Sequence, residues 1–173
     1  MVLVICSIAF VLVSLLRIPA SFGTSLPGLA VGALLVAFGL LWAGWVFMFR
    51  TPKEFLLSTF LTFKKALTRA DPSNPLGRAE PFIVDGPYLY VRNPTYFGAC
   101  VMFLGAALIT GATFLVLSTL GLAIWFNLIV MPYETREMKA LFGQDYVTYT
   151  KMVPAFIPSG KAVYGRSKQK PGS

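Results

Sequence analysis

The chain has 173 residues, of which 56% are hydrophobic and only 13% charged, and its formal net charge is +8. Soluble domains carry about 25% charged residues, so this composition excludes a disordered chain and argues against an ordinary soluble enzyme. The chain contains no histidine, which excludes histidine-based zinc sites and catalytic triads. We therefore expect an all-α integral membrane protein without a metal site.

Four stretches with few or no charges follow one another along the chain, and a transmembrane helix needs about 20 apolar residues. We predict spans at about residues 1–18, 28–49, 95–111 and 113–131. The first span lacks the basic start and cleavage site of a signal peptide, so we interpret it as a retained helix. The last two spans share the uncharged segment Tyr96–Met131, which is too long for one span and is predicted to turn near Gly111 as a helical hairpin.

Charge is confined to two segments between and after these spans. Every Lys and Arg except Arg17, and every Asp and Glu, lies in residues 50–94 or 134–173. The positive-inside rule therefore predicts that segments 50–94 and 132–173, together with both termini, are cytoplasmic. Residues 1–173 are then expected to form a single multi-pass domain.

The charged segments have predicted structure of their own. Glu54–Lys65 is expected to lie at the membrane surface as an amphipathic helix. Glu134–Lys151 is predicted to be helical with a break at Gly143. The basic C-terminal tail is expected to contact anionic lipid head groups rather than nucleic acid.

Small residues recur at intervals that suit close helix packing in lipid, where no hydrophobic force drives association. We interpret this pattern as helix packing rather than as a site. The residues are Gly28, Gly32 and Gly39 in the second predicted span, Gly98 and Gly105 in the third, and Ala112 directly after the third.

Two sequence blocks carry the functional signal, one around residues 85–98 and the other in residues 134–158. Their matching residues are Gly86-Pro87-Tyr88, Val91-Arg92-Asn93-Pro94, Tyr96, Gly98, Glu134, Phe142-Gly143, Tyr146, Tyr149, Val153-Pro154 and Ile157-Pro158. In order and spacing these blocks resemble the isoprenylcysteine carboxyl methyltransferase and phospholipid methyltransferase family of integral membrane enzymes.

The chain departs from the family pattern at three positions. Asn93 stands where many members have His, and Met138 replaces a Leu. Thr135 stands where the second Glu of a Glu-Glu pair is expected, and Glu137 is out of register with that pair.

The resemblance implies S-adenosylmethionine as methyl donor, a membrane lipid or prenylated acceptor, and a cytoplasmic cap that binds the cofactor. Methyl transfer needs positioning more than an acid or a metal. The leading acceptor is an isoprenylcysteine carboxylate, and the amine of phosphatidylethanolamine is the alternative. An NADPH-dependent sterol-type reductase and a non-catalytic membrane protein are the less favoured alternatives.

The resemblance also places the site. The predicted catalytic residues are Glu134, Arg92 and Asn93. The cofactor site is expected to contain Tyr88, Val91, Arg92, Asn93, Pro94, Tyr96, Gly98, Tyr146 and Tyr149.

Each of these roles has a plainer alternative. Glu134 either orients the acceptor or acts as a base, or it is a carboxylate that suits a helix N-terminus. Arg92 either contacts a ligand carboxylate or anchors the chain at the membrane surface. Asn93 precedes Pro94, which favours an extended backbone, so its amide either faces a ligand or stabilises a turn. The tyrosines either line the cofactor site or belong to an interfacial aromatic belt.

Asn127 and Trp125 are the candidates for a lipid substrate tunnel. A polar side chain is costly in lipid, so Asn127 is expected to face the interior of the helix bundle. An interhelical hydrogen bond is the alternative role for Asn127.

Overall fold

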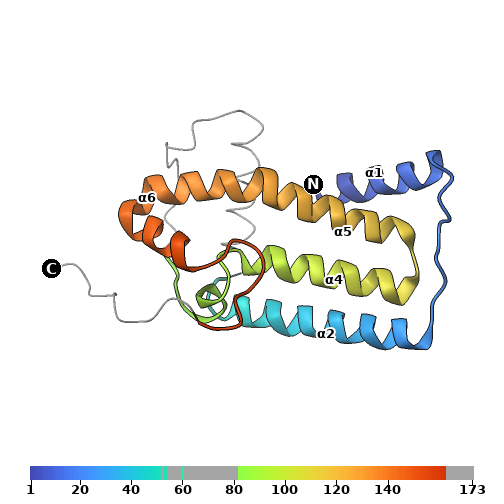
Figure 1. The fold of residues 1–173 in the computed structure, drawn as a ribbon, viewed down its shortest axis with the longest axis horizontal. Coiled ribbons are helices and arrows are strands. Elements are labelled where there is room, and N and C mark those ends of the chain that lie inside the picture. The colour runs from blue at the N-terminus through green and yellow to red at the C-terminus, as the bar shows by residue number, and fades with distance from the viewer. Residues whose placement is uncertain (52, 54–59, 61–81, 163–173) are drawn as a thin grey trace. The chain divides into compact units, whose positions relative to one another are not determined.

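The computed structural model describes residues 1–51, 53, 60 and 82–162. In chain order the elements are α1 (Val2–Leu15), α2 (Leu26–Phe47), the 3-10 helix η1 (Gly86–Leu89), α4 (Pro94–Thr110), α5 (Thr113–Trp125), the π-helix η2 (Phe126–Val130) and α6 (Met131–Met152) (Figure 1). The described residues form no strand beyond an isolated bridge between Ser21 and Ala112, which confirms the all-α prediction. Almost all of Glu54–Lys65 lies outside the described residues.

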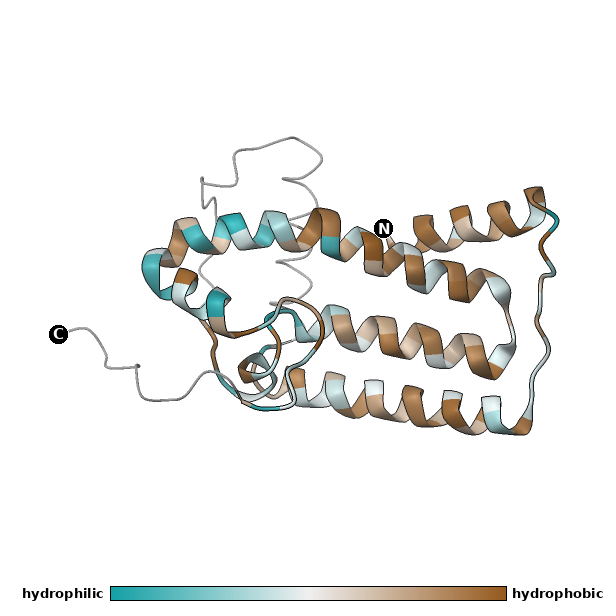
Figure 2. Cartoon of the chain, viewed as in Figure 1, coloured by the Kyte–Doolittle hydropathy of each residue, from teal (hydrophilic) through white to brown (hydrophobic). Residues whose placement is uncertain are grey.

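Two helical runs are long and apolar enough to cross a membrane. They are α2 and the run Thr113–Met152, in which α5, η2 and α6 follow one another without a loop. Helices α1 and α4 are apolar but shorter. Figure 2 shows this composition, since brown residues dominate these helices whereas teal residues gather in α6. Four spans and a cytoplasmic orientation stay predictions.

The chain divides into two compact units. Unit 1 contains Met1–Gly44 and Thr95–Ile129, and unit 2 contains Trp45–Pro94 and Val130–Ser173. A single domain over residues 1–173 stays a prediction.

Within unit 1, α2 and α4 pack through glycine. A Cβ atom added to Gly32 would lie 2.8 Å from the carbonyl oxygen of Gly105, and one added to Gly105 would lie 2.8 Å from that of Gly32. Real side chains do not approach a backbone this closely, so the two helices need glycine at both positions. This contact confirms the packing interpretation for Gly32 and Gly105. Elsewhere on the same two helices, the ring of Phe97 lies 5.5 Å from that of Trp42.

Also within unit 1, the loop after α1 is tied to the turn between α4 and α5. The N–H of Phe22 donates to the carbonyl oxygen of Gly111 at 2.9 Å, and the N–H of Thr113 donates to that of Ala20 at 3.0 Å. The Thr113 hydroxyl donates to the carbonyl oxygen of Pro19 at 2.6 Å. Gly111 has a φ of +65°, a conformation that favours glycine. The hairpin therefore turns where the sequence predicts.

The irregular turn η2 immediately precedes Met131 and Pro132. Proline has no N–H, so Pro132 cannot donate to the carbonyl oxygen of Leu128 four residues earlier. The π turn, a rare departure from α geometry, ends at Val130, two residues before this proline. The helix then continues as α6 instead of ending near residue 131, where the fourth predicted span ends.

In unit 2, α6 bends sharply at Gly143, whose φ of 54° and ψ of −130° are non-helical. This bend confirms the predicted break. It lets the second half of α6 contribute Tyr146 and Tyr149 to the core of the unit, which also contains Val84 and Val153. The side chains packed against this core are Phe82, Met138 and Phe142.

Candidate functional site

The two sequence blocks that carry the family resemblance bind each other within unit 2. The Tyr149 hydroxyl donates a buried hydrogen bond to the carbonyl oxygen of Tyr88 at 2.7 Å. The backbone N–H of Arg92 donates to the carbonyl oxygen of Pro154 at 2.9 Å. Both contacts join residues about sixty positions apart, so they fix the first block against the C-terminal one.

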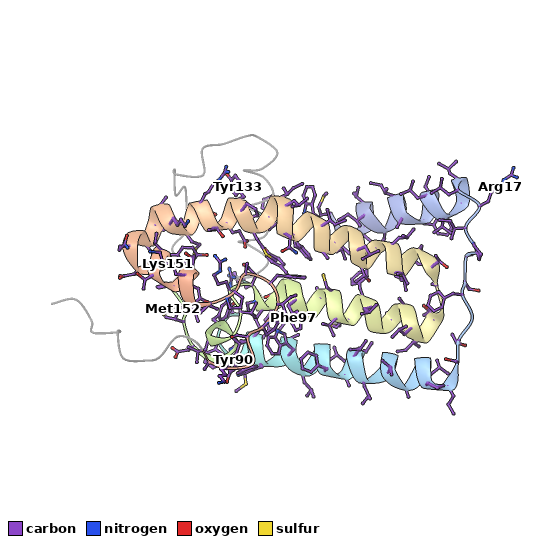
Figure 3. The ribbon with its side chains drawn as sticks, in the orientation of Figure 1. Arg17, Tyr90, Phe97, Tyr133, Lys151 and Met152 are labelled. Carbon is purple, nitrogen blue, oxygen red and sulfur yellow. The ribbon has the colours of Figure 1, made fainter. Side chains whose placement is uncertain are left out.

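Asn93 belongs to the same connection. Its Nδ2 donates to the carbonyl oxygen of Ala155 at 2.9 Å. The N–H and hydroxyl of Ser159 both donate to the carbonyl oxygen of Tyr90, at 2.9 Å and 3.0 Å. Figure 3 labels Tyr90 in this part of the chain, and the Tyr90 ring lies 5.8 Å from that of Trp45. The geometry thus gives the amide of Asn93 a loop-stabilising contact, and its catalytic role stays a prediction.

Gly86, at the start of the first block, is required by geometry. Its φ is +58°, and a Cβ atom there would collide with the ring of Phe49. Gly86 opens η1, in which Pro87 is buried and Tyr88 is 8% exposed. The Gly-Pro-Tyr pattern is therefore a folding signal that places the residues leading to Arg92.

Four polar side chains meet around the hydroxyl of Tyr146. Arg92 and Thr135 both hydrogen-bond to Tyr146, and Glu134 acts on it electrostatically. We call Arg92, Glu134, Thr135 and Tyr146 the Tyr146 cluster. Glu134 is half-buried in the first turn of α6.

The bend at Gly143 is what brings this cluster together. Thr135 and Tyr146 are eleven residues apart, so a straight helix would separate them by about 16 Å along its axis. Because α6 folds back at Gly143, the two side chains are within hydrogen-bonding distance. The backbone conformation of Gly143 therefore determines that Thr135 and Tyr146 meet in the cluster.

Within the cluster, Arg92 keeps one donor unused. Its Nε is buried and has no hydrogen-bond partner among the described residues. A buried donor without a partner costs about 1–3 kcal/mol, so its presence points to an acceptor that binds there. A guanidinium suits a carboxylate in particular, because its N–H groups match the two carboxylate oxygens.

Burial raises the pKa of the Tyr146 hydroxyl, and the charge of Glu134 raises it further. The charge of Arg92 and the hydrogen bonds from Arg92 and Thr135 oppose this rise. The net direction is upward, so Tyr146 is protonated at neutral pH and can act as a hydrogen-bond donor.

Sequence reasoning missed two residues of this region. In the sequence Thr135 is only a departure from the family pattern, yet its side chain contacts Tyr146. In the sequence Glu137 is out of register with the family's Glu pair, yet it is only 1% exposed. It follows Glu134 by three residues, a spacing that puts two side chains on the same face of a helix. That spacing is the signal which could have identified Glu137.

The remaining predicted cofactor residues lie in two settings. Within unit 2, Val91 is 0% exposed and Pro94 is also buried. Within unit 1, Tyr96 stacks on Phe126 with the ring centroids 4.4 Å apart, and a Cβ atom on Gly98 would lie 3.0 Å from the Trp42 ring. Their roles as cofactor contacts stay predictions.

The expectation for Asn127 is wrong in one respect. Asn127 is exposed rather than turned into the bundle, and its Nδ2 donates to the carbonyl oxygen of Ala123 on the same helical run at 2.8 Å. A polar side chain on a helix can bond to the carbonyl oxygen four residues earlier, and Asn127 satisfies its amide in this way within its own helical run. Trp125 is half-buried at the end of α5. A substrate tunnel at these residues stays a prediction.

The described residues bring together no group of three or more Cys, Asp or Glu side chains that could hold a metal ion. The functional groups of the Tyr146 cluster are one guanidinium, one carboxylate and two hydroxyls. Such a set can bind and orient an anion.

The fold and these groups define an all-helical protein with apolar helices long enough for a membrane and a polar cluster built by a bent helix. Residues 27–145 match the phospholipid methyltransferase family. The chain belongs to this family.

Two curated relatives agree with this assignment. The chain is 30% identical over 139 residues to methanethiol S-methyltransferase 1 of Bradyrhizobium diazoefficiens. This matched region covers 79% of the chain and 45% of the relative. The chain is also 34% identical over 77 residues to protein-S-isoprenylcysteine O-methyltransferase of Schizosaccharomyces pombe. This matched region covers 44% of the chain and 32% of the relative. The chain therefore spans less than half the length of either relative. No solved structure matches it significantly.

Proposed function

We propose that this chain transfers a methyl group from S-adenosylmethionine to a carboxylate acceptor at the membrane, most specifically that of an isoprenylcysteine. The observation that carries this proposal is the buried Nε of Arg92, which has no partner among the described residues. Family membership supplies the reaction class, and one relative is named as an isoprenylcysteine O-methyltransferase. These findings also leave the reductase and non-catalytic alternatives without support.

The side chains of the cluster fit S-adenosylmethionine as well as the acceptor. Both molecules carry a carboxylate, and Arg92 offers a buried donor that has no partner in the part of the chain that the structure describes. S-adenosylmethionine supplies a methyl group on a sulfonium sulfur, which a nucleophile attacks directly. Arg92 and Tyr146 would hold and orient the bound carboxylate, and Glu134 would orient the acceptor. Positioning of this kind accelerates a two-reactant step without an acid or a metal.

A small thiol is the second candidate acceptor. It is favoured by the 139-residue similarity to a methanethiol S-methyltransferase, which extends over more of the chain than the other relative does. The same cluster would then bind the carboxylate of the methyl donor through Arg92. The two candidates differ in whether the acceptor itself carries a carboxylate.

The test is to measure two quantities in detergent for the wild type, Arg92→Gln and the control Arg17→Gln. Isothermal titration measures binding of S-adenosylhomocysteine, and radiolabelled transfer to N-acetyl-S-farnesylcysteine measures activity. Arg17 is an exposed arginine of unit 1, so its variant should resemble the wild type within about threefold. For Arg92→Gln we expect kcat/KM to fall by about 100-fold, the loss that follows when a charge-assisted contact is removed.

The outcome also shows which carboxylate Arg92 binds. Weaker binding of S-adenosylhomocysteine by Arg92→Gln assigns the guanidinium to the methyl donor. Unchanged binding with a raised KM assigns it to the acceptor. Full activity of Arg92→Gln, or a wild type that does not bind S-adenosylhomocysteine, contradicts the proposed function.

A further inference from the structure

We propose that residues 151–161, which we call the C-terminal strap, bind the surface of an anionic bilayer and insert the side chain of Ile157 into it. The partner is the lipid surface itself, with lysines against its phosphates and an aliphatic side chain below them. The inference goes beyond methyl transfer and does not depend on it, because no side chain of the strap belongs to the Tyr146 cluster.

The first argument is the exposure of the strap. Ile157 is 71% exposed, and Met152, which ends α6 and is labelled in Figure 3, is 38% exposed. Among the described residues 82–94 and 130–162 of unit 2, these are the large apolar side chains that the fold leaves exposed. Exposed apolar area rimmed by polar residues marks a place of contact with a protein or a membrane.

The second argument is that the strap is held on both sides of Ile157. On the N-terminal side, the carbonyl oxygen of Ala155 accepts a hydrogen bond from Nδ2 of Asn93 at 2.9 Å. On the C-terminal side, the N–H and hydroxyl of Ser159 donate to the carbonyl oxygen of Tyr90, at 2.9 Å and 3.0 Å. Because the fold already fixes the backbone here, little conformational entropy is left to lose when the strap binds.

The third argument is charge, which distinguishes a lipid surface from a protein partner. Lys151 and Lys161 stand at the two ends of the strap, and both are exposed. No Asp or Glu occurs after Asp145, whereas Lys or Arg occurs five times. An aliphatic side chain between exposed lysines complements a bilayer with anionic head groups. A symmetric contact with a second copy of the chain would instead bring like charges together.

The experiment measures the depth of residue 157 by spin labelling of the full chain in vesicles of phosphatidylcholine and phosphatidylglycerol. Cys6 and Cys100 are free thiols, so both are replaced by Ala before Ile157→Cys is introduced and labelled with a nitroxide. Gln144→Cys with the same label is the matched control, because Gln144 is an exposed residue of the same unit. Collisions with oxygen, which concentrates among acyl chains, and with a nickel chelate, which stays in water, report the surroundings of each label.

We expect the label at residue 157 to favour oxygen, at a depth of about 5–10 Å into the boundary of head groups and acyl chains. The label at residue 144 should favour the nickel chelate. Replacing Lys151 and Lys161 by Gln should lower the ratio of immersed to aqueous label at residue 157 by about fivefold for each lysine removed. In vesicles of phosphatidylcholine alone the double change should have almost no effect. Lys139→Gln removes another exposed lysine of α6 and should leave the ratio within about twofold.

Three results would overturn the inference. Equal access of the nickel chelate to residues 157 and 144 would place the strap in water. Exclusion of both reagents from residue 157, with dipolar broadening between labelled copies, would show a protein contact instead. A ratio that the double lysine change leaves unaltered in anionic vesicles would show that anionic head groups play no part. The proposed function stands under all three results, since its own test is binding of S-adenosylhomocysteine and the activity of Arg92→Gln.

Discussion

The two units of this chain differ in what they expose and in how they pack. Unit 1 exposes large apolar side chains, among them Leu3 and Leu26, each 81% exposed, and Leu41, which is 76% exposed. Apolar surface on this scale indicates contact with membrane. Its internal contacts are close backbone approaches such as that between Gly32 and Gly105.

Unit 2 instead has a core of aromatic and aliphatic side chains around Tyr146 and Tyr149, and hydrogen bonds that tie its loops together. Its Tyr146 cluster depends on one backbone bend. The difference teaches that unit 1 depends on small residues where its helices meet, such as Gly32 and Gly105, whereas unit 2 depends on particular dihedral angles and polar contacts. The following variants test this contrast.

Gly143→Ala should have the largest effect, because it acts on the bend that assembles the site. The backbone at Gly143 has a φ of +54° and no atom within 4 Å of an added Cβ, so the only cost is conformational, about 1–3 kcal/mol. Relief of that strain would move Tyr146 away from Thr135. We expect methyl transfer to fall by about 100-fold, measured as kcat/KM.

The matched control is Gly160→Ala. Gly160 likewise has no atom within 4 Å of an added Cβ, and its φ is not in the left-handed region. It should therefore retain nearly full activity. Equal activity of the two alanine variants would show that the bend is not needed for the site.

Gly32→Leu should break unit 1 by overpacking. Its side chain would meet the backbone of Gly105, and such a clash typically costs 1–3 kcal/mol. Gly44→Leu lies on the same helix with open space around it, so it should stay within about 0.5 kcal/mol of the wild type. Thermal unfolding in detergent measures both variants. A stable Gly32→Leu protein would refute the close approach of α2 and α4.

Asn93→Ala separates a structural from a catalytic role. The variant removes the hydrogen bond to Ala155, which is worth about 1 kcal/mol. We expect a lower melting temperature with kcat reduced by less than about threefold. A kcat that falls by about 100-fold or more at unchanged stability would restore the catalytic role that the sequence suggests for Asn93.

Much of unit 1 was predictable because its signals are local. The apolar length of 28–49 is enough to predict α2, which is observed at Leu26–Phe47. Gly111 alone predicts the turn between α4 and α5, because few other residues adopt its φ of +65°. The role of Gly32 follows from small-residue spacing, since lipid leaves close backbone contact as the main source of helix packing.

The candidate site was less predictable because it depends on contacts between distant residues. The break at Gly143 was foreseen, but not its dihedral angles, and only those angles bring Tyr146 back to Thr135. The burial of Glu137 depends on which face of α6 turns inward. The direction of Asn127 depends on a π turn, which 3.6-residue periodicity does not describe.

The smallest expected effect concerns Tyr146→Phe, which keeps the ring in the core of unit 2 and removes only the hydroxyl. Burial raises the pKa of Tyr146 above its usual value near 10, so the folded protein holds this proton to a higher pH than the unfolded chain does. The resulting stability is complete below about pH 10 and is lost as pH rises through the folded pKa. In thermal unfolding at about pH 9 to 11, stability should therefore fall less steeply for Tyr146→Phe than for the wild type. Identical slopes would show that the folded protein does not disfavour the phenolate form of Tyr146. Unit 2 would then lack the dependence on buried polar groups that distinguishes it from unit 1.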